Sequence, residues 1–164
     1  MKIIFNSTSI LNSKERQETF PEKKDIGFLL KTPCDITFYQ ENGIPKVKLE
    51  SGYKRFVEPR PPMEGFKTPY GYSDNHFHWN INWGPELPKG YSALYIPPLN
   101  NFSLPFITTS GIIDNDKLTT TGRLPFFIKK NFEGTIKRGT EYINIIPFKR
   151  EDWEAEYNYD IRHI

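Results

Sequence analysis

The sequence predicts a mainly β protein in which short strands form a barrel or a sandwich. Aromatic residues make up 15% of the 164-residue chain, and large flat side chains suit sheets better than helical bundles. The chain has 14 prolines, which accumulate at turns and sheet edges because helix interiors and central strands exclude them. In the second half, short strand-like stretches alternate with turn residues at even spacing. The length fits one ordinary domain.

The first half predicts one clear hairpin. Residues 1–31 show no single secondary-structure pattern. Within them, residues 13–18 resemble a helical turn or an exposed loop that Ser13 could cap. Residues 35–39 alternate β-branched and aromatic side chains, as a strand does. The dipeptide at 42–43, Asn-Gly, is a hairpin turn, and residues 45–49 predict the return strand.

A proline-rich segment at residues 58–70 comes next. We expect it to form no regular structure and to be an ordered connector or a flexible arm. Residues 76–83 then alternate strictly, which predicts a strand with one face in a core. The polar face holds His76, His78, Asn80 and Asn82, and the apolar face holds Phe77, Trp79, Ile81 and Trp83.

Four further strands are expected at residues 91–96, 107–113, 124–129 and 142–148. The tail after residue 150 is charged and aromatic, and it suits a short helix or an arm that docks on a neighbour. We therefore divide the chain into an N-terminal extension with the hairpin and the proline-rich connector (1–78), a β-barrel core on which we expect this extension to pack (79–150), and a C-terminal arm (151–164).

Charge and cysteine content narrow the class of protein. A net charge of +2 is too small to indicate nucleic-acid binding, and a single cysteine, Cys34, excludes an intramolecular disulfide framework. No apolar run approaches the ~20 residues of a membrane span, so no membrane association is expected. The apolar start at residues 1–5 is too short for a signal peptide. We expect a cytoplasmic protein, in the host cytoplasm if the gene belongs to a phage.

Three motifs in the second half resemble those of the trimeric dUTPase and dCTP deaminase superfamily. They are Pro88-Lys89-Gly90-Tyr91-Ser92-Ala93, Gly111-Ile112-Ile113-Asp114-Asn115-Asp116, and the closing segment from Phe127 to Pro147. They occur in the family's order at nearly its separation and cover somewhat under half of the chain. The resemblance implies a dUTPase-like β-barrel of the β-clip type that assembles as a homotrimer. The same motifs are similar to an uncharacterised group of marine tailed-phage proteins.

The resemblance also assigns roles to individual positions. Asp114 matches the aspartate that orients and deprotonates the attacking water, and a carboxylate can act as such a base. Lys117 stands where the family has the tyrosine that stacks under the pyrimidine. Residues 98–100, which end in Asn100, replace the phosphate-binding Arg-Ser-Gly motif, and Asn144 replaces the glutamine of the closing strand. The glycine-rich arm of the family is missing.

These departures argue against dUTP hydrolysis, because phosphoryl chemistry needs several charges around phosphate and metal at once. No residue is assigned as catalytic, and Asp114 is the only match. The candidate ligand-binding residues are Asp114, Asp116, Asn144, Lys117, Asn100 and Arg138. The alternative for residues 114–116 is a turn whose side chains bond their own backbone. No cofactor is expected, and Mg²⁺ is expected only together with a bound nucleotide.

Two other groups of residues carry alternative hypotheses. His76 and His78 share a strand face, as metal ligands do in cupin-type barrels, with Glu86 or Asp74 as an added carboxylate. The remaining histidine, His163, is not on a later barrel strand, so the alternative is a polar outer face or an interface. Three basic pairs, at residues 129–130, 137–138 and 149–150, could clamp an anion or could be solvated strand ends.

Three functions follow from these observations. The first is a phage-encoded, non-catalytic protein that holds a nucleotide or related anion in pockets between trimer subunits, with a sequestering or regulatory role. The second is a phage structural or host-interaction protein without a small-molecule ligand, whose C-terminal arm contacts a protein partner. The third is a metal-dependent barrel enzyme that uses His76 and His78.

Overall fold

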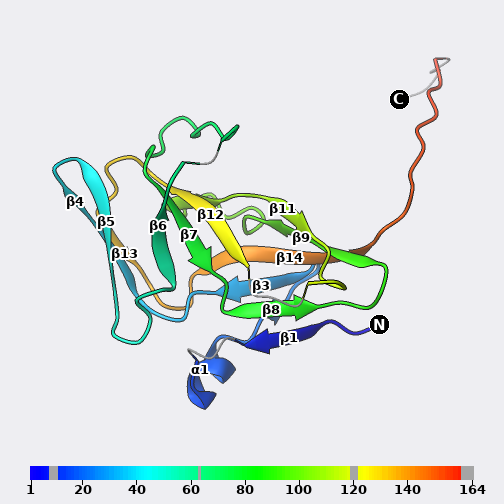
Figure 1. The fold of residues 1–164 in the computed structure, drawn as a ribbon, viewed down its shortest axis with the longest axis horizontal. Coiled ribbons are helices and arrows are strands. Elements are labelled where there is room, and N and C mark those ends of the chain that lie inside the picture. The colour runs from blue at the N-terminus through cyan, green and yellow to red at the C-terminus, as the bar shows by residue number, and fades with distance from the viewer. Residues whose placement is uncertain (8–10, 63, 119–121, 160–164) are drawn as a thin grey trace.

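The computed structural model describes residues 1–7, 11–62, 64–118 and 122–159, and it is mainly β. One short helix, α1 (Ser13–Glu18), accompanies fourteen strands in these ranges (Figure 1). The strands are β1 (Ile4–Ser7), β2 (Glu22–Lys23), β3 (Phe28–Lys31), β4 (Ile36–Glu41), β5 (Ile44–Leu49), β6 (Val57–Arg60), β7 (His76–Asn80), β8 (Trp83–Glu86), β9 (Tyr91–Ile96), β10 (Phe106–Thr108), β11 (Gly111–Ile113), β12 (Arg123–Ile128), β13 (Gly134–Ile136) and β14 (Glu141–Lys149).

The strands form four antiparallel sheets that mix early and late parts of the chain. Their orders are β1-β8, β10-β12-β7-β6, β11-β9-β14-β3-β2 and β13-β4-β5. The N-terminal strand β3 lies next to β14, and β6 lies next to β7. The strands before residue 79 therefore share sheets with those after it.

The predicted hairpin is confirmed. Strands β4 and β5 pair from Ile36 opposite Leu49 to Glu41 opposite Ile44. Both turn residues have positive φ, 52° at Asn42 and 77° at Gly43, which is the combination that a two-residue hairpin turn requires.

The short helix is present where the sequence suggested one, but its cap is different. Ser13 is the first helical residue, and Asn12 is the N-cap. The Asn12 side chain accepts a hydrogen bond from the Glu15 backbone at 2.9 Å, and the Glu15 carboxylate accepts one from the Asn12 backbone at 2.9 Å. This reciprocal capping box satisfies two backbone donors at the start of the helix.

Three strand predictions need correction. The proline-rich segment begins with a regular strand, β6, which tolerates Pro59 because it is an edge strand. The alternating run at 76–83 divides into β7 and β8, which lie in different sheets. The stretch at 107–113 likewise divides into β10 and β11.

Stacked aromatic side chains form the centre of the core, as expected for the apolar face of residues 76–83. The Trp79 ring is fully buried and stacks on Phe126, with ring centroids 3.9 Å apart and planes 17° apart. The rings of Phe106 and Tyr142 pack against the same indole, with centroid distances of 5.1 and 5.0 Å.

The C-terminal tail leaves the body of the protein at the end of β14. Residues 151–159 form neither helix nor strand, and they project away from the sheets (Figure 1). The helical alternative for this part of the tail is therefore wrong; residues 160–164, with His163, lie outside the described residues. Across the described ranges, no helix is long and apolar enough to cross a bilayer.

Candidate functional site

The turn after β11 holds the two candidate carboxylates, Asp114 and Asp116. The Asp114 carboxylate accepts a hydrogen bond from the Ser92 hydroxyl at 2.5 Å, and its Oδ1 lies 3.5 Å from Arg150 Nη1. Asp116 accepts two bonds from the Arg150 guanidinium, at 2.9 and 2.5 Å, and one from the Gly90 backbone at 2.8 Å. Protein groups therefore enclose the Asp116 carboxylate, whereas the Asp114 side chain is 44% exposed and has protein partners at Oδ1.

Arg150 determines the electrostatics of this turn. The Asp116 side chain is only 3% exposed, and the bidentate guanidinium followed by the Gly90 amide holds the pKa of its carboxyl well below the usual range. Arg150 belongs to the third basic pair of the sequence. It binds an anion as one hypothesis for that pair suggested, but this anion is a carboxylate of the same chain.

The residue between the two aspartates has a structural role that the sequence did not reveal. Asn115 is fully buried, accepts a hydrogen bond from the Tyr95 hydroxyl at 2.9 Å and donates one to the Leu118 carbonyl at 3.1 Å. Of the side chains at 114–116, Asn115 bonds the backbone of this turn, but it donates to a carbonyl three residues on, whereas the oxygen of an Asx turn accepts from an amide two residues on. Asp114 and Asp116 instead tie the turn to β9 and to the end of β14.

A second group of predicted residues meets at an open pocket of about 740 Å³ beside β14. Asn144 lies on β14 opposite Leu29 of β3 and Ile96 of β9, and it is 2% exposed. Its Oδ1 is buried without a hydrogen-bond partner. Asn100 also lines the pocket, which is completed by Lys23, Lys24, Asp25, Ile26, Leu29, Leu99 and Glu141.

A tight turn between β2 and β3 builds the lysine wall of this pocket. The Lys24 amide donates to the Gly27 carbonyl at 2.9 Å, and Gly27 has a φ of 74°. A Cβ at this glycine would lie 2.3 Å from the Ile145 carbonyl oxygen, so only glycine allows the turn to press against β14. Sequence reasoning missed Lys23 and Lys24, although Asp25 and Gly27 after them are turn residues.

The predicted site residues do not all come together within one chain. Asn144 pairs with Ile96 and Phe148 with Ser92, so the Asn144 pocket and the Asp114 turn are four residues, or about 13 Å, apart along one ladder. Lys117 closes the Asp114 turn, where its backbone donates to the Asp114 carbonyl at 3.0 Å, and its side chain is exposed. Arg138 lies elsewhere, where its guanidinium pairs with Glu18 and its backbone donates to Asp35 at 2.8 Å.

His76 and His78 are buried, which corrects the expectation of a polar outer face. They are 3% and 6% exposed, because the connector before β7 and the neighbouring strands cover them. His76 Nε2 bonds the Thr68 hydroxyl at 3.2 Å, and its Nδ1 has no partner. His78 Nε2 lies 3.4 Å from a Glu58 carboxylate oxygen, without hydrogen-bond geometry.

Burial lowers the pKa of both imidazoles from the usual 6.5, and the Glu58 carboxylate partly opposes this at His78. Within the described ranges, no group of three His, Cys, Asp or Glu side chains is placed to hold a metal ion. The pair therefore has no third ligand among these residues.

Comparisons with known proteins agree with the fold. No protein-family model and no curated protein matches the sequence. Among solved structures, a dUTPase from phage phi11 of S. aureus matches with a TM-score of 0.50 and 10% identity, over 99% of this chain and 100% of that one. The EIAV dUTPase matches with a TM-score of 0.46 and 14% identity, over 99% of this chain and 100% of that one. A Staphylococcus bacteriophage 80alpha dUTPase matches with a TM-score of 0.48 and 10% identity, over 99% of this chain and 91% of that one.

The chain therefore has a mainly β, dUTPase-like fold, which confirms the fold expected from the three motifs. The match extends over nearly the whole chain, including the first 78 residues, for which the sequence offered no resemblance. At 10% identity the likeness establishes the fold alone.

Proposed function

We propose that this chain is a non-catalytic binding protein that holds a nucleotide or related anionic ligand on a dUTPase-like fold. The observation that carries the proposal is the buried, unpartnered Oδ1 of Asn144 beside Lys23 and Lys24. A buried acceptor without a donor costs about 1–3 kcal/mol, and a ligand N–H group would remove that cost.

The chemistry of the pocket supports a ligand with both a polar ring and a negative charge. The Lys23 ammonium favours phosphate, and the Leu29 and Leu99 side chains offer an apolar surface for a base. The Lys24 ammonium also lines the pocket, where it pairs with the Glu22 carboxylate at 3.0 Å. Asp25 and Glu141, which line the same pocket, are carboxylates of the kind that Mg²⁺ accepts, and we expect Mg²⁺ only together with a nucleotide.

The state of the Asp114 turn supports binding without hydrolysis. A general base must orient and deprotonate a water, and one oxygen of the Asp114 carboxylate, Oδ1, is already bonded by Ser92 and lies beside the Arg150 guanidinium. We propose further that the chain is a homotrimer, in which the pocket of one subunit is completed by a neighbour. The third hypothesis, a metal enzyme using His76 and His78, gains no support from two buried imidazoles.

Replacing Asn144 by leucine should separate binding from stability. Leucine removes the orphaned acceptor, so the melting temperature should stay the same or rise, while nucleotide affinity should fall at least about tenfold. Titration calorimetry of the full chain with deoxynucleoside mono-, di- and triphosphates and cyclic nucleotides measures both the affinity and its loss.

The matched control is Asn101→Leu. Asn101 is close to the pocket, but its side chain accepts from Ser103 at 3.1 Å instead of lining the cavity. This variant should bind as the wild type does. No heat from any member of the panel, or equal affinity in the Asn144→Leu variant, would overturn the proposal.

A further inference from the structure

The projecting tail has the residue pattern of a β-strand with one acidic face. From Asp152 to Tyr159 the side chains alternate, with Trp153, Ala155, Tyr157 and Tyr159 in one set and Asp152, Glu154, Glu156 and Asn158 in the other. The three rings are 86%, 74% and 94% exposed in chain order. Three fully solvated rings on an extended segment indicate a surface made to contact something else.

A groove that could receive such a segment lies between β5 and β6. It has a volume of about 580 Å³, and its apolar wall consists of Tyr39, Ile44, Val47, Leu49, Val57 and Phe77. Among the described strands, β5 pairs only with β4 and β6 only with β7, so two sheet edges border the groove. Free edges are where extended segments add to a sheet.

The charges on the groove select for an acidic segment. Lys46, Lys54 and Arg60 line it, and Glu58 lines it as well but is bonded by Asn80 at 2.8 Å. Asp74 is the other acidic residue on the wall. Proline and lysine on an edge discourage indiscriminate strand pairing, so Pro45 and Lys46 leave this edge open chiefly to a strand that brings negative charge.

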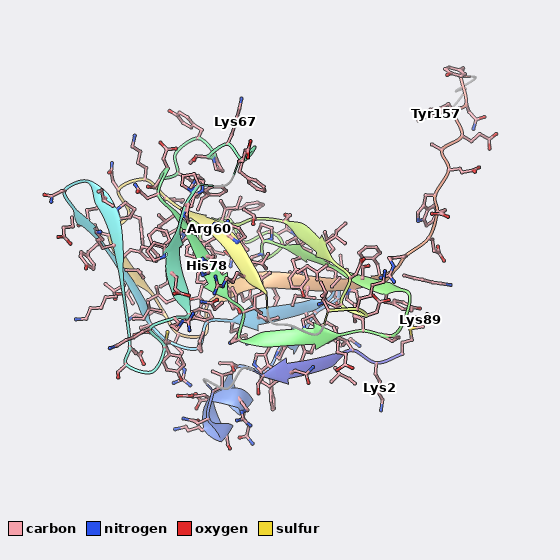
Figure 2. The ribbon with its side chains drawn as sticks, viewed as in Figure 1. Lys2, Arg60, Lys67, His78, Lys89 and Tyr157 are labelled. Carbon is pink, nitrogen blue, oxygen red and sulfur yellow. The ribbon has the colours of Figure 1, made fainter. Side chains whose placement is uncertain are left out.

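The tail supplies that charge. Residues 151–159 contain four acidic side chains and no lysine or arginine, so the rest of the chain carries +6 when the whole carries +2. The tail also lies away from the groove: Figure 2 shows Tyr157 on the projecting tail at the upper right and Arg60 left of centre in the body. The tail projects away from the body, so the groove that it can reach belongs to another molecule (Figure 1).

We propose that residues 151–159 dock along the β5–β6 groove of a second copy of this chain. Trp153 and Tyr157 pack on the apolar wall, and Glu154 and Glu156 face Lys46, Lys54 and Arg60 of that copy. The contact joins two different surfaces, so it is heterologous and closes into a ring or continues as a chain according to its rotation. It does not depend on the nucleotide proposal, because it uses neither Asn144 nor the Asp114 turn.

Photo-cross-linking of the full chain tests this contact. The photoreactive p-benzoylphenylalanine replaces Tyr157, and ¹⁵N-labelled and unlabelled proteins are mixed before irradiation. The expected product joins the tail peptide of one isotope to residues 44–60 of the other. In the Lys46→Glu/Arg60→Glu variant the yield should fall about tenfold, since two attractive pairs become repulsive. Combining that variant with Glu154→Lys/Glu156→Lys should restore it.

The matched control is Lys2→Glu/Lys89→Glu, which makes the same change in charge at exposed positions outside the groove (Figure 2). The cross-link yield of this control should equal that of the protein with an unchanged groove. Circular dichroism checks the fold of every variant. Cross-links confined to one chain, cross-links to another surface, no cross-link, or full yield after charge reversal in the groove would each overturn the proposal.

Discussion

Replacing Trp79 by alanine is expected to lower the free energy of unfolding by about 3–5 kcal/mol, the usual cost of removing a large buried ring. The indole is fully buried among aromatic side chains, and it donates from Nε1 to the Thr108 hydroxyl at 2.9 Å. That hydroxyl in turn donates to the Tyr142 carbonyl at 2.7 Å. The substitution therefore leaves a large cavity and an unpaired acceptor at the point where three strands meet.

Urea denaturation followed by circular dichroism measures this effect. Trp79→Phe should cost less than Trp79→Ala, because the ring still packs on Phe126 while the bond to Thr108 is lost. The control Tyr70→Ala removes a fully exposed aromatic ring and should leave the unfolding free energy within ~0.5 kcal/mol of the wild type. Equal effects at positions 70 and 79 would contradict the assignment of Trp79 to the core.

Acidification below pH 6.5 is expected to destabilise the protein through His76 and His78. Burial lowers the pKa of both imidazoles in the folded chain, whereas the unfolded chain has the usual 6.5. Between these values the unfolded state binds more protons, so stability is complete above about pH 6.5 and decreases as the pH falls. The slope is at most about 1.4 kcal/mol per pH unit for each histidine.

The charged groups around the pair modify this effect without changing its sign. The Arg60 charge opposes protonation of His76 and Asp74 favours it, while at His78 Glu58 favours protonation and Arg123 opposes it. Urea midpoints at pH 7.5 and 5.5 measure the loss, which His78→Gln should reduce because glutamine does not titrate. A wild-type midpoint that does not change between the two pH values would show that the imidazoles are not held neutral.

Local patterns predicted the hairpin and the later strands because neighbouring residues determine them. The turn at 42–43 and the strand at 91–96 depend on turn chemistry and alternation within a few residues. Strand β3, in contrast, is a short run that is stable because β14 lies beside it. The alternation at 76–83 continues across a change of sheet, so the period alone could not locate the break after Asn80.

The candidate site was harder to predict because long-range contacts define it. The motif resemblance pointed to Asp114 and Asn144, and in the structure Asn144 lines a pocket with Asn100. Arg150 is 34 residues from Asp116, and no local pattern connects the two. The burial of His76 depends on the proline-rich connector, which the sequence could describe only as ordered or flexible.

The central claim, that the chain keeps a dUTPase-like fold and binds a nucleotide without hydrolysing it, is tested most directly by ³¹P NMR of dUTP with Mg²⁺ and stoichiometric protein. The account predicts broadened or shifted phosphate resonances, which the Asn144→Leu variant weakens, with no pyrophosphate formed over many hours. Pyrophosphate accumulating beyond one equivalent per chain, and lost in Asp114→Asn, would contradict it and show that Asp114 still acts as a base.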